Sequence, residues 1–179
     1  MRHPFPAQID DGLAAFRQIR DRRFSAMRIR THGDLHLNQI LYTGKDFVFI
    51  DFEGELSRPL SERRIKRSAL RDVASILCSF QYAAYAVRFG RVSGVSVRAE
   101  RTAEVERWAE IWYSWISSLY LKGYLDTAAR ATFLPRNEEE LKLLLNAYVI
   151  EEAVDELGHD LTDRPDWCRI PMRSIQMLL

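Results

Sequence analysis

The chain has few cysteines, no long apolar run and no excess of charge of either sign. Its two cysteines, Cys78 and Cys168, stand in apolar surroundings without metal-ligand spacing, so we expect reduced, buried thiols in a cytoplasmic protein. No stretch reaches the length of a membrane span, and the first residues lack the apolar core of a signal peptide. The 26 basic and 25 acidic residues give a net charge of +1, which supports neither a nucleic-acid partner nor a membrane surface.

With 179 residues, 47% of them hydrophobic, the chain has the size and composition of one globular domain, and we treat residues 1–179 as a single unit. Two short apolar runs, residues 39–42 and 47–52, flank a Thr-Gly-Lys-Asp turn and predict a hairpin. Hydrophobic periodicity and helix-end signals predict helices over five ranges: 11–27, 69–89, 100–122, 137–157 and 171–179. The sequence therefore predicts a mainly α fold with one small β-hairpin.

Three local patterns add detail to this expectation. Asn137, followed by three glutamates, predicts the N-cap of a helix. Trp108, Trp112 and Trp115, at spacings of four and three, form one helical stripe, which we expect to lie in the core because aromatic side chains supply large buried area. Six basic side chains lie between Arg58 and Arg71, and we expect them to face solvent in a loop.

The most informative segment is residues 32–39, together with the end of the apolar run that follows it. Asp34 and Asp51 are 17 positions apart, and the amide of Gln39 lies between them. Phosphoryl transfer from a nucleotide uses a carboxylate beside the acceptor hydroxyl and further oxygen ligands on magnesium. Asp34 is then the candidate base, Gln39 and Asp51 are candidate metal ligands, and Glu53 is a candidate for a second metal or for substrate. A surface hairpin with solvated acids is the alternative.

The letters H-G-D-L-H-L-N-Q at 32–39 and I-D-F-E-G-E at 50–55 resemble the aminoglycoside-phosphotransferase-like kinases, and more closely the bacterial maltokinases. Those enzymes are similar in fold to protein kinases, phosphorylate maltose with ATP and Mg²⁺, and several are fused to trehalose synthase. The resemblance continues through residues 58–74 and resumes at 164–171. It implies the C-terminal lobe of a kinase-like fold, with the catalytic loop and hairpin at about 30–53 and a helical bundle at about 69–179.

The resemblance also assigns roles to single residues. Asp34 matches the catalytic aspartate, and Gln39 and Asp51 match the magnesium ligands. Asp72 matches an aspartate that braces the catalytic loop, and His32 is a structural hydrogen-bonding residue in the same loop. For Asp72, an ordinary acid at the start of a helix is the alternative.

The acceptor-binding helix departs from the maltokinase pattern. Where maltokinases carry a lysine and two tyrosines, this chain has Glu152, Asp155 and His159, which spacings of three and four place on one helical face. An acidic face suits a cationic acceptor better than a neutral sugar. His36 and Trp167 complete the candidate acceptor-binding residues.

We therefore expect the catalytic lobe of a sugar kinase of trehalose or glycogen metabolism, acting on ATP and a maltose-like sugar. The residues before Asp34 leave no room for the five-stranded N-terminal lobe of such a kinase, because its strands need about five to six residues each. We expect little or no activity without that lobe. Expected partners are the missing N-terminal lobe, which another chain could supply, and a trehalose synthase domain. Two alternatives stay open: a non-catalytic kinase-like module, and a small-molecule kinase of the aminoglycoside or choline type.

Overall fold

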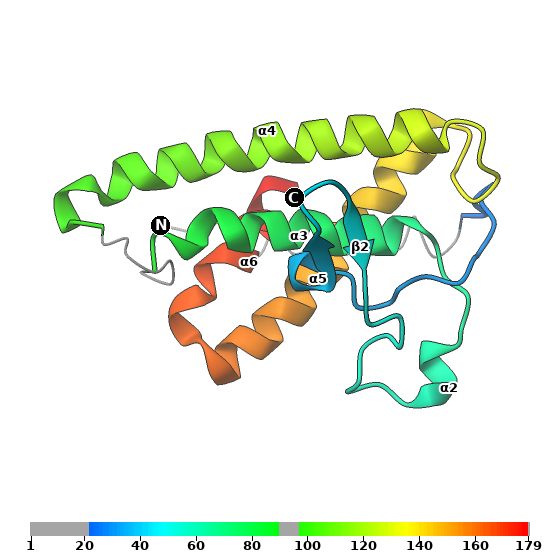
Figure 1. Ribbon diagram of the computed structural model, residues 1–179, viewed down its shortest axis with the longest axis horizontal. Coiled ribbons are helices and arrows are strands. Elements are labelled where there is room, and N and C mark those ends of the chain that lie inside the picture. Colours follow the sequence, from blue (N-terminus) through cyan, green and yellow to red (C-terminus); the bar gives the residue numbers. More distant parts are fainter. Residues whose placement is uncertain (1–21, 90–96, 179) are drawn as a thin grey trace, which may run out of the picture.

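The computed structural model describes residues 22–89 and 97–178, most of which are helical (Figure 1). The predicted mainly α fold with one hairpin is confirmed. Its helices are α2 (Leu60–Arg63), α3 (Leu70–Ala86), α4 (Thr102–Ala128), α5 (Glu138–Asp163) and α6 (Arg169–Leu178), with short 3₁₀ turns at Leu37–Gln39, Ala99–Arg101 and Pro165–Trp167. The strands β1 (Ile40–Tyr42) and β2 (Phe47–Phe49) pair antiparallel, with Ile40 opposite Phe49.

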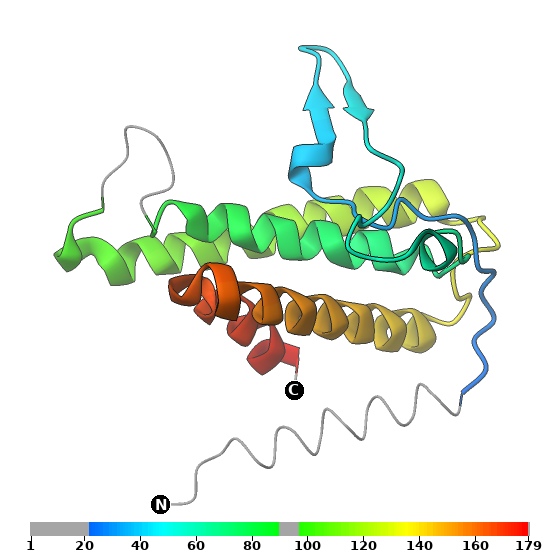
Figure 2. The same cartoon turned by 90° about the horizontal axis from the view of Figure 1, so that it is seen from below.

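The core is built around α3, which packs against α4 on one side and against α5 on the other (Figures 1 and 2). Leu70, Val73, Ala74 and Leu77 recur at helical spacing and are buried, as the strongly apolar sequence of this helix predicts. They join a cluster that α5 completes with Leu144, Leu145 and Val149. A second cluster at the far end of α3 contains Tyr85, Ala109, Trp167 and Ile170.

The N-terminal helix prediction is wrong where it can be compared with the structure. Residues 22–27 form no helix, and residues 11–21 lie outside the described part of the chain. The backbone of this segment pairs with distant segments instead: Met27 N donates to Thr132 O at 3.1 Å. Ile29 and Arg67 exchange two backbone hydrogen bonds of 2.9 Å. These tertiary hydrogen bonds replace the local ones that a helix would make.

The tryptophan stripe is not in the core, which corrects the sequence-based expectation. Trp108, Trp112 and Trp115 are 64%, 45% and 69% exposed. Among the described residues of α4, Ala109 alone is buried. The helix lies at the edge of the molecule, where α3 covers one of its faces (Figure 1). Trp112 meets Phe80 of α3 edge to face, with ring centroids 6.4 Å apart, yet it stays 45% exposed.

The hairpin stands away from the helices (Figure 2), and all of its strand residues except Ile40 are exposed. Its second strand was predicted to reach Phe52 but ends at Phe49, and one more hydrogen bond follows, from Ile50 N to Gln39 O at 3.0 Å. Asp51 has φ of +59°, a left-handed conformation that turns the chain out of the ladder.

Two further expectations have mixed outcomes. The helix predicted over 137–157 continues to Asp163, because one glycine inside a helix, here Gly158, costs only about 1 kcal/mol. Cys78 is a buried free thiol, and burial raises its pKa well above the ordinary value, whereas Cys168 is partly exposed. A separate feature is the length and composition of the helices. None of the described helices combines the length and apolar character needed to cross a membrane.

Asn137 caps α5 as the sequence predicts, since its side chain accepts hydrogen bonds from the Glu139 and Glu140 amides at 2.8 and 3.4 Å. We expect Asn137→Ala to lower the free energy of unfolding by about 1 kcal/mol, as measured by urea denaturation. Asn137→Ser keeps a capping oxygen and is the control. Equal stabilities of the Ala and Ser variants would contradict the assigned cap.

Candidate active site

The loop at 32–34 is held by a carboxylate from the first turn of α3. Asp72 accepts hydrogen bonds from the backbone amides of His32, at 2.7 Å, and Gly33, at 3.0 Å. The buried His32 ring has its Nε2 2.7 Å from the Ile50 carbonyl, so Nε2 carries the proton that this contact needs. The loop is therefore tied to α3 on one side and to the end of the hairpin on the other.

Two glycines allow a second segment to pass close to this loop. Gly33 has φ of +83° and Gly54 has φ of +74°, both in the left-handed region. A Cβ at Gly33 would lie 3.6 Å from the Gly54 Cα. Glycine is the residue that adopts this backbone without strain, and its use here keeps the chain after the hairpin beside Asp34.

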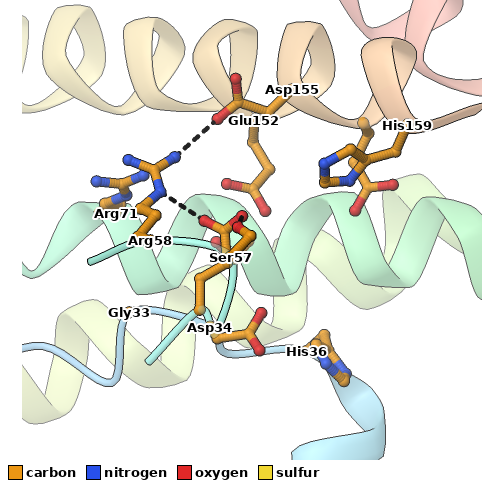
Figure 3. Close-up of a pocket in the computed structure, with 12 residues that line it drawn as sticks. Gly33, Asp34, His36, Ser57, Arg58, Arg71, Glu152, Asp155 and His159 are labelled. Carbon is orange, nitrogen blue, oxygen red and sulfur yellow. Dashed lines mark hydrogen bonds and ion pairs between the residues drawn. The ribbon is translucent and has the colours of Figure 1, made fainter. Parts of the chain in front are cut away.

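Asp34 and His36 line a cavity of about 470 Å³ between the loop, α3, α5 and residues 55–58 (Figure 3). The full lining is Gly33, Asp34, His36, Glu55, Ser57, Arg58, Arg71, Ser75, Glu152, Asp155, Glu156 and His159. A second cavity of about 460 Å³ adjoins it and shares Asp34, His36, Ser75, Glu152 and Glu156. The two cavities together form one cleft, and Asp34 belongs to both.

The cleft gathers most of the residues that the sequence singled out for catalysis and acceptor binding. Figure 3 shows Asp34 and His36 on one side and the α5 residues Glu152, Asp155 and His159 facing them across the cavity. The three α5 positions predicted to share a helical face all line this cavity.

Trp167 lies in the wall of the second cavity, but its ring is largely used in packing. Its exposed fraction is 9%, and the rings of Tyr82 and Phe89 stack on it at centroid distances of 5.8 and 5.1 Å. The guanidinium of Arg164 lies 5.3 Å from the ring centroid. Little of the ring remains for stacking on a ligand, and acceptor binding by Trp167 stays a prediction.

The acids of α5 differ in how they are neutralised. Asp155 is 3.2 Å from Arg58, whose Nε also lies 2.6 Å from Glu55. Glu156 is 3.6 Å from Arg164. Within residues 22–89 and 97–178, Glu152 makes no ion pair within 4.0 Å, although it lines both cavities. Among the α5 acids that line the cleft, Glu152 is thus the one without an ion-pair partner in the described part of the chain, and Asp34 on the opposite wall makes no ion pair there either.

Burial, with smaller contributions from the nearby Glu156 and Asp155, raises the pKa of the Glu152 carboxyl to about 7 against the opposing effects of Ser75 and Arg71. Burial likewise raises the pKa of Glu156. A carboxyl that titrates near neutral pH, in a cleft beside a candidate catalytic aspartate, is typical of functional sites.

The backbone positions of the two proposed metal ligands are close to each other at the base of the hairpin. The Ile50–Gln39 backbone bond puts Gln39 opposite the residue that precedes Asp51, and both lie outside the lining of the two cavities. In the described part of the chain, no group of three or more histidine, cysteine or acidic side chains could hold a metal. One amide and one carboxylate fit Mg²⁺, which takes the rest of its ligands from water and nucleotide phosphates. Glu53 is exposed, and its backbone carbonyl accepts a hydrogen bond from Arg63 Nη1 at 3.1 Å.

Sequence reasoning missed two arginines of the cleft. Arg58 and Arg71 were expected to face solvent, but both line the first cavity and Arg71 is buried. Other members of the basic run, such as Arg64 and Lys66, are exposed as expected. The distinguishing signal is the acid that each arginine meets after folding, Asp155 for Arg58 and Glu151 for Arg71, which local sequence does not reveal.

Comparison with known proteins places this geometry in a known fold. No family model matches the chain. A glucosamine kinase of Streptacidiphilus jiangxiensis is 26% identical over 152 residues, which cover 84% of this chain and 32% of that protein. Crystal form A of a glucosamine kinase matches with a TM-score of 0.72 and 22% identity over 96% of this chain and 39% of the other.

A structure titled as glucosamine kinase in complex with glucosamine, ADP and inorganic phosphate matches with a TM-score of 0.73 and 23% identity, over 97% of this chain and 38% of the other. At this identity the likeness establishes the fold. The chain has the fold of about two-fifths of a glucosamine kinase, and it spans about a third of the curated relative.

Removal of the Asp72 carboxylate should destabilise the loop. Asp72→Ala leaves two amides without their acceptor, so we expect a loss of about 1–3 kcal/mol in unfolding free energy and faster hydrogen exchange at His32 and Gly33. Asp72→Asn keeps one acceptor oxygen and should lose less. Asp126→Ala, in an exposed ion pair with Lys122 on α4, is the matched control and should change stability by less than about 1 kcal/mol. Unchanged exchange at both amides would contradict the bracing role.

The raised pKa of Glu152 predicts a pH-dependent stability. Its pKa moves from 4.5 to about 7 on folding, so its contribution to stability is greatest below pH 4.5 and falls as the pH rises to 7. Glu152→Gln should therefore be more stable than wild type at pH 8, by about 1–3 kcal/mol, and similar to it near pH 5. Urea denaturation at both pH values measures this, with the exposed Glu138→Gln as control. A difference that does not change with pH would contradict the shift.

Proposed function

We propose that this chain is the catalytic and acceptor-binding lobe of an ATP-dependent sugar kinase whose acceptor is an amino sugar. The observation that carries the proposal is Glu152, a partly buried carboxylate without an ion-pair partner among the described residues, which shares a cavity with Asp34. The fold shared with glucosamine kinase supports it.

In this proposal Asp34 acts on the acceptor hydroxyl. A sugar in the first cavity brings a hydroxyl to the Asp34 carboxylate, which orients it and accepts its proton as the oxygen attacks the terminal phosphorus of ATP. The new bond joins the sugar oxygen to phosphorus, the bond to the bridging oxygen breaks, and ADP leaves. Asp72 and His32 position Asp34 through the loop backbone.

Gln39 and Asp51 are the residues that would hold magnesium. A bound ion neutralises charge on the transferring phosphate. Their place at the hairpin base, outside the acceptor cavity, suits a nucleotide that approaches from the hairpin side.

Glu152 distinguishes an amino sugar from a neutral one. An ammonium group would give this carboxylate a charged partner in a partly desolvated site, where such hydrogen bonds contribute about 1.5–3 kcal/mol. A neutral sugar leaves the Glu152 carboxylate without a charged partner. Asp155 and Glu156 contribute less, because Arg58 and Arg164 already neutralise them.

Maltose is the acceptor that the sequence resemblance implies, and it stays the second candidate. It is favoured by the length of the cleft, which has two adjoining cavities. Choline and aminoglycosides carry the cation that Glu152 favours, so they belong in the same comparison. A non-catalytic module that only binds sugar has the same binding site, and phosphoryl transfer by the protein that contains both lobes separates it from a kinase.

The test is sugar binding by the 179-residue chain, measured by calorimetry at pH 7.5. We expect glucosamine to bind about tenfold or more tightly than N-acetylglucosamine or maltose, because only glucosamine presents an ammonium group to Glu152. Glu152→Gln should remove this preference, whereas the control Glu138→Gln should keep it. Tighter binding of maltose than of glucosamine would favour the maltokinase alternative, and an unchanged preference in Glu152→Gln would refute the role of that residue.

A further inference from the structure

We infer that the acceptor has two rings: an amino sugar in the first cavity, joined to a neutral hydroxyl-rich ring in the second. This inference rests on the proposed function and extends it to the size and shape of the substrate. It comes from the second cavity, which the proposed reaction with glucosamine leaves unused.

The two cavities are parts of one cleft. Each has a volume, about 470 and 460 Å³, within the range of a complete small-molecule site. They meet at Asp34, His36 and Glu152, so a ligand that offers a hydroxyl to Asp34 has room on both sides of it. A single pyranose ring with its ammonium at Glu152 would fill only part of this space.

The second cavity has the chemistry of a sugar subsite. The α3 residues Cys78, Ala83 and Ala86 give it an apolar floor, and Asn38 and Ser79 add polar groups. Sugar rings combine apolar C–H faces with hydroxyls at the rim, which this lining matches.

Arg164 is the fixed polar group of this cavity. Its Nη2 lies 2.9 Å from the buried Asp160 and 3.6 Å from Glu156, and its guanidinium lies over the rings of Tyr82 and Trp167 at 5.6 and 5.3 Å. Both ion pairs use Nη2, which leaves Nε and Nη1 as donors toward a ligand. A guanidinium held in this way binds a pair of neighbouring hydroxyls at little cost in side-chain entropy.

The charges of the two cavities differ, and this difference orients the ligand. Glu152, an acid without an ion-pair partner among the described residues, lies where the two cavities meet, and an ammonium is favoured there. The charged groups of the second cavity beyond Asp34, His36 and Glu152 are Glu156 and Arg164, which already pair with each other. Beyond Asp34 and Glu152, the described lining of the second cavity contains no acid without an ion pair to receive a second ammonium, so the second ring is uncharged.

The experiment compares one-ring and two-ring ligands on the 179-residue chain by calorimetry. The probes are glucosamine and two disaccharides in which a neutral hexose is attached to O1 or to O4 of glucosamine. We expect at least one disaccharide to bind about tenfold tighter than glucosamine. Ala83→Phe fills the second cavity and should return the affinity for this disaccharide to that for glucosamine.

Ala83 is exposed and lines the second cavity, so the larger side chain enters the cavity without displacing core residues, and circular dichroism checks the fold. Ala83→Leu is a milder variant, expected to lose part of the gain, and Ala103→Phe on the exposed surface of α4 is the control, expected to retain it. If neither disaccharide binds tighter than glucosamine, or if Ala83→Phe weakens both ligands equally, the two-ring inference is overturned while the amino-sugar proposal stands. Absence of glucosamine binding would overturn the proposed function itself.

Discussion

The site depends on the contact between the Asp72 carboxylate and the backbone of the loop that precedes Asp34. This one side chain, in the first turn of the most buried helix, fixes the amides of two successive residues, His32 and Gly33. The same helix, α3, also supplies the core that α4 and α5 pack against. The Asp72 hydrogen bonds therefore anchor the loop that carries Asp34 directly to the core. A catalytic carboxylate held through backbone hydrogen bonds keeps its own oxygens for the substrate.

The ion pairs that the arginines make determine which acids of the cleft stay unpaired. Arg58 and Arg164 each neutralise an acid of α5 and leave Glu152 between them without a direct partner. The same helix thus contributes both the paired acids, which join α5 to neighbouring segments, and an ionisable group whose charge is costly in the empty cleft. The ionised Glu152 favours binding of a cationic ligand. At high pH its charge also lowers the stability of the ligand-free protein, so one residue links ligand recognition to stability.

Features set by short-range chemistry could be predicted from the sequence. The hairpin, the Asn137 cap and the convergence of Glu152, Asp155 and His159 on one face follow from spacings within a single element. Features set by tertiary neighbours could not. The spacing of Trp108, Trp112 and Trp115 correctly predicts one stripe along the helix. Whether the stripe is buried depends on whether another helix covers it, and the hydrophobic periodicity of α4 carries no information about that. The backbone at 27–29 pairs with Thr132 and Arg67, which are distant in the sequence and therefore beyond the reach of helix periodicity.

The projecting hairpin has a consequence for the behaviour of the chain in concentrated solution. In the described part of the molecule, each of its two strands has one strand neighbour, so the outer edges of β1 and β2 retain unpaired backbone groups. The side chains beside these edges are aromatic or aliphatic and exposed, including Tyr42 at 65% and Phe47 at 62%. An open strand edge with apolar side chains is a template for intermolecular β-pairing. The exposed hairpin edges therefore favour self-association of the chain through β-pairing, and a charged side chain at Val48, in the middle of β2, would oppose it without altering the cleft.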